Sequence, residues 1–203
     1  PYKGAYSEGP EYETIWAFTG TTDTTSREAT IAADELCDDL GIDTISTGCT
    51  IGFAYELYEK GILTKADADG LELNYGNHES MVVLVKKIAN REGIGDLLAE
   101  GVARAAANIG KGAEAYAIHV KGLELPAYEP RGAKTQGFNY ATASIGASHC
   151  FGYSGQDVFG AIVPRPSDRF AEEENADLVV YNQDNTAWKE TGIICSFASN
   201  WGW

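Results

Sequence analysis

The chain has 203 residues, enough for one large domain or two small ones, and 44% of them are hydrophobic, as is usual for soluble globular proteins. Its 30 acidic and 15 basic residues give a net charge of −15, which would repel a phosphate backbone, so we expect no nucleic-acid partner. No apolar run approaches the ~18–20 residues of a membrane-spanning helix and no secretory signal is present, so we expect a cytoplasmic protein without membrane contact.

The N-terminal part of the chain predicts a turn followed by a capped helix. The first twenty residues show no strong period, and the Gly-Pro pair at 9–10 indicates a turn. Thr25 with Glu28 forms a capping box, and one apolar stripe then continues as far as Leu40. We expect Gly41 to end this helix.

Three more helices are predicted before residue 110. A polar loop over 43–48 leads to a helix over about 50–60. Asn77 caps the next helix, which we expect to end near Gly93. An Ala-rich segment over 95–109 predicts a fourth helix that Gly110 ends.

The second part of the chain has a weaker pattern. Residues 117–124 alternate apolar and polar side chains and are predicted to be extended, and the two prolines in 125–130 predict a rigid loop. Residues 133–168 are rich in glycine and aromatic residues and are expected to be irregular, whereas a last helix covers about 174–190. The fold class predicted is therefore mainly α, with long ordered loops.

Two acidic residues lie where a helix disfavours them. Asp38 and Asp39 are in the last turn of the first predicted helix, where the helix dipole opposes negative charge by ~0.3–1 kcal/mol each. A ligand for these carboxylates is one interpretation, because the following run leads to free N–H groups at another helix start. The other interpretation is that Asp43 and Thr47 only cap and shape a turn.

The four cysteines are scattered and form no CxxC pair. Spacing alone therefore predicts neither a disulfide framework nor a complete metal site. Taken singly, each is either a small buried residue or a ligand. They are Cys37, Cys49, Cys150 and Cys195.

Six longer motifs run collinearly through nearly the whole chain. They are GPEYET (9–14), DELCDDLGIDTISTG (34–48), AYELYEKG (54–61), GDLLAEG (95–101), HVKGLELPAYEPRG (119–132) and QDNTA through CSF (183–197). On these motifs the sequence resembles the aldehyde:ferredoxin oxidoreductase family. The resemblance implies a fragment that comprises the multihelical domains 2 and 3 and lacks the N-terminal β-rich domain. Residues 1–120 would form the first helical domain and 121–203 part of the second.

The resemblance implies tungsten, or molybdenum, held between two pyranopterins beside a 4Fe–4S cluster. Each pterin would be bound by a short loop. The first loop would contribute Asp38, Gly41, Asp43 and Thr44, and the second Glu190, Ile194 and Ser196. Cys195 would be the fourth thiolate ligand of the cluster, since such clusters need four. The other three would come from a CxxCxxxC motif that precedes the GPEYET segment and is not in this sequence.

Glu13 and His149 match family residues that lie beside the metal. His149 would move protons near neutral pH, and Glu13 would orient water or take a proton. Without the resemblance, Glu13 would be interpreted as a solvated acid and His149 as a hydrogen-bonded packed histidine. Tyr128 and Arg131 either line the cofactor cleft or only position the backbone.

The implied activity is the oxidation of aldehydes to carboxylic acids under anaerobic conditions, of the EC 1.2.7 type, with electrons passing through tungstopterin and the cluster to ferredoxin. Two alternatives are kept: a subunit of an aromatic acyl-CoA reductase, and a non-catalytic relative that retains the scaffold.

Four positions depart from the family pattern. Some members hold a metal between two subunits by a Glu and a His, but those positions are Ala32 and Val82 here. A homodimer would therefore lack this bridging metal. The second loop has Glu190 where Asp is usual and Ile193 where Gly is usual.

Overall fold

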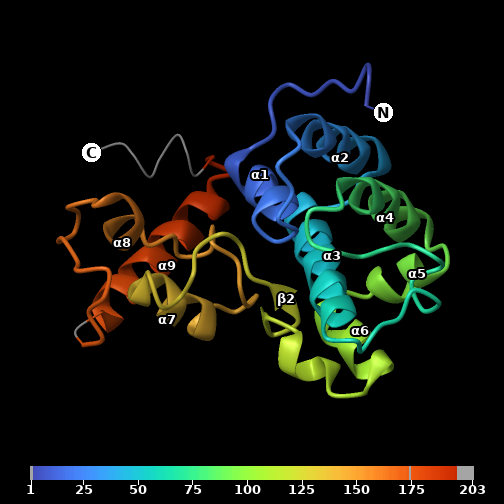
Figure 1. Ribbon diagram of the computed structural model, residues 1–203. Coiled ribbons are helices and arrows are strands. Elements are labelled where there is room, and N and C mark those ends of the chain that lie inside the picture. The colour runs from blue at the N-terminus through green and yellow to red at the C-terminus, as the bar shows by residue number, and fades with distance from the viewer. Residues whose placement is uncertain (1, 174, 196–203) are drawn as a thin grey trace. The chain divides into compact units, whose positions relative to one another are not determined.

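The computed structural model describes residues 2–173 and 175–195, and its chain folds into two compact units, Pro1–Ala127 and Tyr128–Trp203. Helices dominate both units (Figure 1). Among the described residues, no helix is both long and apolar enough to cross a membrane. The division expected from the resemblance falls after residue 120, and the first compact unit extends to Ala127 and includes both strands of the hairpin that begins at His119.

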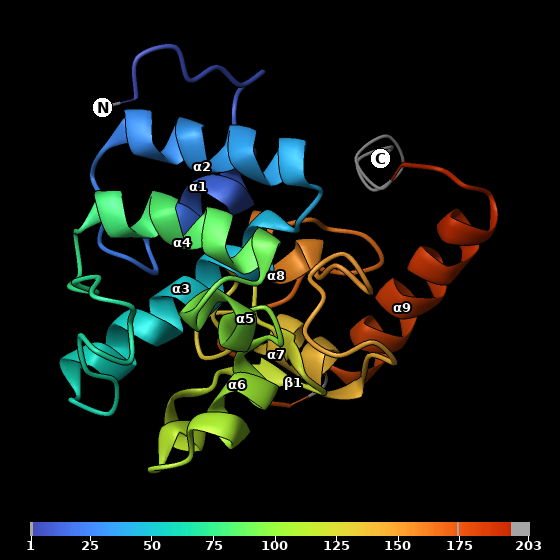
Figure 2. The same cartoon turned by 90° about the vertical axis from the view of Figure 1, so that its right-hand side faces the viewer.

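The first unit contains six α-helices, one 3-10 turn and one hairpin among its described residues. They are α1 (Tyr12–Thr19), α2 (Arg27–Leu40), α3 (Thr44–Glu59), α4 (His78–Asn90), α5 (Ile94–Leu98), α6 (Val102–Ile109), η1 (Ala113–Tyr116), β1 (His119–Val120) and β2 (Leu123–Glu124). Helices α2 and α4 pack side by side, as Figures 1 and 2 both show.

Helix α3 is the central element of the first unit. Its Ile51, Tyr55 and Leu57 are fully buried in the apolar core. Gly48 lies against α1 so closely that a Cβ there would overlap the carbonyl group of Ala17. The absent side chain therefore allows the C-terminal half of α1 to pack closely against the N-terminal half of α3.

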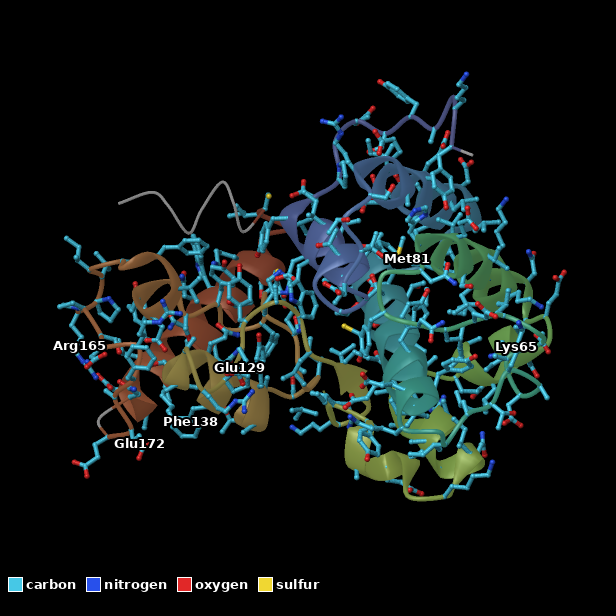
Figure 3. All side chains as sticks on the ribbon, viewed as in Figure 1. Lys65, Met81, Glu129, Phe138, Arg165 and Glu172 are labelled. Carbon is cyan, nitrogen blue, oxygen red and sulfur yellow. The ribbon has the colours of Figure 1, made fainter. Side chains whose placement is uncertain are left out.

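The core of the first unit also accommodates a few buried polar side chains. Figure 3 shows Met81 inside the packed helices and Lys65 at the outer rim. Met81 is fully buried, and the hydroxyl groups of Thr22 and Thr24 lie 3.6 and 3.8 Å from its sulfur. These contacts give both hydroxyls a weak acceptor in the interior.

Several predictions for the first unit are confirmed. The helix that ends at Gly41, the cap at Asn77 and the stop at Gly110 all occur as predicted. The extended segment is a tight hairpin, because Lys121 and Gly122 both adopt positive φ angles, of 56° and 85°.

Other predictions for the first unit are wrong. Ser26, not Thr25, caps α2 by accepting a hydrogen bond from the backbone N–H of Ala29. The predicted polar loop over 43–48 is mostly helix, because Asp43 caps α3 at its start. Helix α1 lies in the segment that showed no strong period.

The predicted helix over 95–109 is divided into α5 and α6 by Gly101, which has a φ of 78°. The carboxylate of Glu124 in β2 accepts a hydrogen bond of 2.8 Å from the backbone N–H of Val102. A side chain distant in sequence thus caps α6, and the helix begins there.

The second unit contains three helices among its described residues, α7 (Lys134–Thr142), α8 (Gly155–Phe159) and α9 (Ala176–Thr191). The prediction of a last helix over about 174–190 is confirmed by α9. The prediction that 133–168 is irregular is wrong for α7 and α8. Helix α7 has no apolar period because it buries Thr135, Gln136 and Asn139.

Buried polar side chains hold the irregular loop between α7 and α8. The backbone N–H of Ser154 donates to Gln136 (2.9 Å), and that of Gly152 donates to Thr186 of α9 (3.1 Å). Both accepting side chains are buried. The loop therefore has a defined shape although it lacks regular structure.

The surface ion pairs of the second unit are exposed. Arg165 binds Asp177 at 2.7 Å and Lys134 binds Glu172 at 3.0 Å. Figure 3 shows Arg165 and Glu172 at the rim of the unit. Exposed pairs contribute little stability, about 0–1 kcal/mol each, so the buried hydrogen bonds matter more for this unit.

Candidate functional site

A turn with a left-handed residue follows α2. The backbone N–H of Gly41 donates to the carbonyl of Asp38 (3.3 Å), and that of Ile42 to the carbonyl of Cys37 (3.0 Å). Gly41 has a φ of 67°, and no atom lies within 4 Å of where its Cβ would be. This is a Schellman turn, and it leaves the carboxylate of Asp38 exposed.

The turn that follows α9 has the same hydrogen bonds. The backbone N–H of Ile193 donates to the carbonyl of Glu190, and that of Ile194 to the carbonyl of Lys189, each at 3.0 Å. Ile193 takes the place of Gly41, with a φ of 53°. Glu190 therefore corresponds to Asp38 and is also exposed.

The two turns thus have the same backbone hydrogen bonds and an acidic residue at the same position, although they lie in different units. The residue after each turn differs, being Asp43 in the first and Cys195 in the second. Cys195 is exposed. Ser196, which the sequence assigned to the second loop, lies outside the described residues.

The left-handed conformation of Ile193 should cost stability. A side chain disfavours this left-handed conformation by about 1–2 kcal/mol. Glycine has no such penalty, but it loses more entropy on folding. We expect Ile193→Gly to raise the free energy of unfolding by about 0.5–1 kcal/mol, measured by chemical denaturation. Ile194→Gly is the matched control and should lower it, since Ile194 has no positive φ. A loss of stability in Ile193→Gly would contradict the assignment of strain.

Asp43 and Thr44 have local structural roles in the first turn. Asp43 accepts a hydrogen bond of 2.6 Å from the backbone N–H of Ser46, which caps α3. The hydroxyl of Thr44 lies 2.8 Å from that of Thr14, and this contact joins α3 to α1. The interpretation of Asp43 as a cap is confirmed. The capping hydrogen bond occupies one of the two carboxylate oxygens of Asp43.

Glu13 lies in the first turn of α1 and is only 5% exposed, so its description as a solvated acid is wrong. The backbone N–H of Ala127 donates to its Oε2 at 2.9 Å. Burial raises the pKa of Glu13 above its usual value, hydrogen bonds from Ala127 and Tyr12 lower that pKa, and the charge of Asp43 raises it. A buried carboxyl with a raised pKa is suited to taking up a proton.

Two of the four cysteines are packed residues. Cys37 is 1% exposed, and burial raises the pKa of its thiol to about 12. The thiol of Cys49 donates to the carbonyl of Leu125 at 3.3 Å, and burial raises its pKa as well. Both therefore stay protonated at neutral pH. Within the part of the chain that the structure describes, no three His, Cys, Asp or Glu residues gather as a metal site.

His149 lies half-buried in the loop between α7 and α8, among aromatic residues. The ring of Tyr128 stacks on its imidazole with centroids 5.6 Å apart, and the ring of Tyr153 meets it edge-on at 5.9 Å. Its Nε2 lies 3.3 Å from the sulfur of Cys150. The interpretation of His149 as a packed histidine is thus confirmed, and this packing is compatible with a proton-transfer role.

Three residues of the second unit were left uncertain or were missed in the analysis of the sequence. Tyr128 contacts His149, whereas Arg131 is an exposed partner of Glu129, at 2.8 Å. Tyr153 was not predicted as a site residue. The only signal for it was the aromatic content of residues 151–159.

Comparison with known proteins shows the family to which the chain belongs. The family model described as aldehyde ferredoxin oxidoreductase, domains 2 and 3, matches residues 1–203. The chain therefore belongs to the aldehyde ferredoxin oxidoreductase family.

The chain is similar to the tungsten-containing aldehyde ferredoxin oxidoreductases of Pyrococcus furiosus (37% identity over 194 residues) and Thermococcus kodakarensis (38% over 195 residues). Each match covers 95% of this chain and 32% of the relative, so the chain spans about a third of their length. The WOR-like subunit of the aliphatic sulfonate oxidoreductase of Pyrococcus furiosus is 42% identical over 156 residues, which is 73% of this chain and 25% of that one.

The fold also occurs in a solved structure, the active-site complex BamBC of benzoyl coenzyme A reductase with 1,5-dienoyl-CoA. The likeness has a TM-score of 0.72 and 24% identity, and it covers 94% of this chain and 34% of that chain. At this identity the likeness supports the fold alone.

Proposed function

We propose that the enzyme to which this chain contributes oxidises aldehydes to carboxylic acids. The balanced reaction consumes one aldehyde and one water and releases the acid, two protons and two electrons, which pass one at a time to ferredoxin. The observation that carries the proposal is the pair of matching turns after α2 and α9, each with an exposed acid at the same position, the second followed by an exposed cysteine.

The residues of the first turn fit a pyranopterin. A pterin edge presents N–H groups, and the exposed carboxylate of Asp38 is the acceptor that such donors need. The absence of a side chain at Gly41 leaves bare backbone for a planar ring to approach. Asp43 and Thr44 complete this set, with Asp43 offering the carboxylate oxygen that does not cap α3.

The second turn fits the same group less closely. Glu190 supplies a carboxylate at the position of Asp38, but Ile193 is 94% exposed and places a side chain where Gly41 has none. Ile194 and Ser196 would complete this set, and Cys195 would bind the 4Fe–4S cluster as a thiolate.

Tungsten or molybdenum held by two pterins would supply the redox chemistry, and the protein would handle protons and water. Buried Glu13 takes up one proton as water adds to the aldehyde carbon, because its raised pKa favours the protonated form. His149 passes a proton on to solvent, since an imidazole titrates near neutral pH. Ala32 and Val82, 7% and 9% exposed, offer no metal ligand, so a homodimer would form without a bridging metal.

Metal analysis of the intact enzyme, purified without oxygen, tests this proposal. We expect one tungsten or molybdenum and about four irons per chain, together with ferredoxin reduction that depends on an aldehyde. Parallel assays with an alkyl sulfonate and with benzoyl-CoA separate this activity from those in the names of the relatives. Protein with neither heavy metal nor iron would contradict the proposal and favour a non-catalytic scaffold.

A further inference from the structure

The imidazole of His149 is held on three sides within the second unit. Tyr128 stacks on its face with an interplanar angle of 29°, and Tyr153 meets it at 67°. The thiol of Cys150 lies beside Nε2, at 3.3 Å. These contacts make the two ring nitrogens unequal and restrict rotation of the ring.

Tyr153 is the anchored member of this group. Its neighbours in the chain, Gly152 and Ser154, donate their backbone N–H groups to buried side chains of α9 and α7. Its ring stacks on Phe159 of α8 with centroids 5.7 Å apart. The backbone and the ring of Tyr153 are therefore both fixed.

The two tyrosines are joined by a short hydrogen bond. The hydroxyl oxygens of Tyr128 and Tyr153 lie 2.5 Å apart, and the rings are nearly perpendicular, at 88°. This bond transmits the fixed position of Tyr153 to Tyr128, whose ring covers the face of the imidazole. Without the hydroxyl of Tyr153, Tyr128 loses this hydrogen bond to the anchored loop.

We propose that Tyr153 is a positioning residue, whose hydroxyl fixes the orientation of the His149 imidazole by holding Tyr128 against the face of the ring. The inference rests on the proposed function for the proton-transfer role of His149. A fixed ring presents one nitrogen to the reacting group in every turnover, and loss of alignment slows proton transfer more than it weakens substrate binding.

Tyr153→Phe in the intact enzyme tests the inference, because it removes only the hydroxyl and keeps the ring contacts with His149, Tyr128 and Phe159. We expect kcat to fall about tenfold with KM nearly unchanged. The solvent deuterium isotope effect on kcat should rise, since proton transfer becomes slower. Tyr128, Tyr153 and Cys150 contact His149, with Lys189 of α9 next to Cys150, and Tyr153→Phe alters none of the charged side chains.

Tyr181→Phe is the matched control, because Tyr181 is an exposed tyrosine of α9 in the same unit. It should leave kcat and the isotope effect at wild-type values. Unchanged kcat and isotope effect in Tyr153→Phe would overturn the inference. A rise in KM at constant kcat would overturn it as well, since that is the signature of a binding role.

A second measurement needs no turnover. The rate at which diethyl pyrocarbonate modifies His149, followed by mass spectrometry, reports how freely the ring moves. We expect a several-fold faster reaction in Tyr153→Phe, with exposed His119 as an internal reference of constant rate. An unchanged rate would overturn the positioning role whatever the activity. His149→Gln separates the two proposals: if it keeps full turnover, the proton-transfer role fails, and the modification rate still decides whether Tyr153 fixes the ring.

Discussion

Replacing Cys195 with alanine is expected to remove the iron–sulfur cluster while the helices stay folded. A 4Fe–4S cluster needs four thiolates, and Cys195 is exposed at the end of the second turn. Its exposed side chain is not among the buried hydrophobic residues of the described chain, so we expect the helices to stay folded. Iron content per chain, the cluster's electron paramagnetic resonance signal and aldehyde-dependent ferredoxin reduction should all fall, while the far-ultraviolet circular dichroism spectrum is retained.

Cys49→Ala is the matched control for this variant. The thiol of Cys49 is already engaged with the carbonyl of Leu125, so its removal should leave the iron content at the wild-type level. Full iron content and an unchanged cluster signal in Cys195→Ala would refute the assignment of Cys195 as a ligand. Loss of iron in both variants would point to general damage to the fold.

Glu13→Gln is expected to reduce kcat by about 10²–10⁴-fold, the usual contribution of a general acid or base. The same substitution should raise the stability of the protein at neutral pH. Burial raises the pKa of Glu13 above 4.5, so the folded state binds this proton more tightly than the unfolded state does. The glutamine variant is neutral at every pH and avoids the cost of a buried charge.

The sign of the pH dependence follows from the raised pKa. Below about pH 4.5 the carboxyl is protonated in both states, and wild type carries no penalty. As the pH rises from there through the higher pKa of the folded state, the penalty appears, and above that pKa it is constant. The difference in free energy of unfolding between Glu13→Gln and wild type should therefore grow with pH over this window and then level off.

Glu11→Gln is the control for both effects. Glu11 lies two residues earlier and is exposed, so its substitution should change neither kcat nor the pH dependence of unfolding. Denaturant unfolding from pH 4 to pH 8 measures the stability difference. A difference that does not vary with pH would contradict the buried and raised state of Glu13, and full turnover in Glu13→Gln would contradict its proton-transfer role.

Elements with local signals could be predicted from the sequence. Gly41 and Gly110 end helices because a left-handed residue needs no distant partner, and Asn77 caps its helix through its own side chain. The turn after α2, to which the resemblance assigned the first pterin loop, could be predicted for the same reason. Its family motif coincides with a turn whose hydrogen bonds are all between neighbours in the chain.

Elements that depend on distant partners could not be predicted. The division between α5 and α6 is made by Glu124, 22 residues away from Val102, and no pattern in 95–109 indicates it. Helix α7 buries polar side chains, of which Gln136 accepts from the backbone N–H of Ser154 in the loop before α8, and the backbone N–H of Thr135 donates to Asp157 of α8. Its sequence therefore resembles a loop. Tyr153 was missed because its role comes from Tyr128, 25 residues earlier.

The loop that contains His149 is held by hydrogen bonds from its own backbone N–H groups, which has a consequence for how much substitution the loop tolerates. Every amino acid except proline has a backbone N–H, so most side chains of this loop can change without loss of its anchors. Gly146 and Gly152 are exceptions, because their φ angles are 94° and 86°, and a Cβ at Gly152 would also overlap Asn139. Exposed side chains such as Ile145 can therefore be exchanged while the ring of His149 keeps its place.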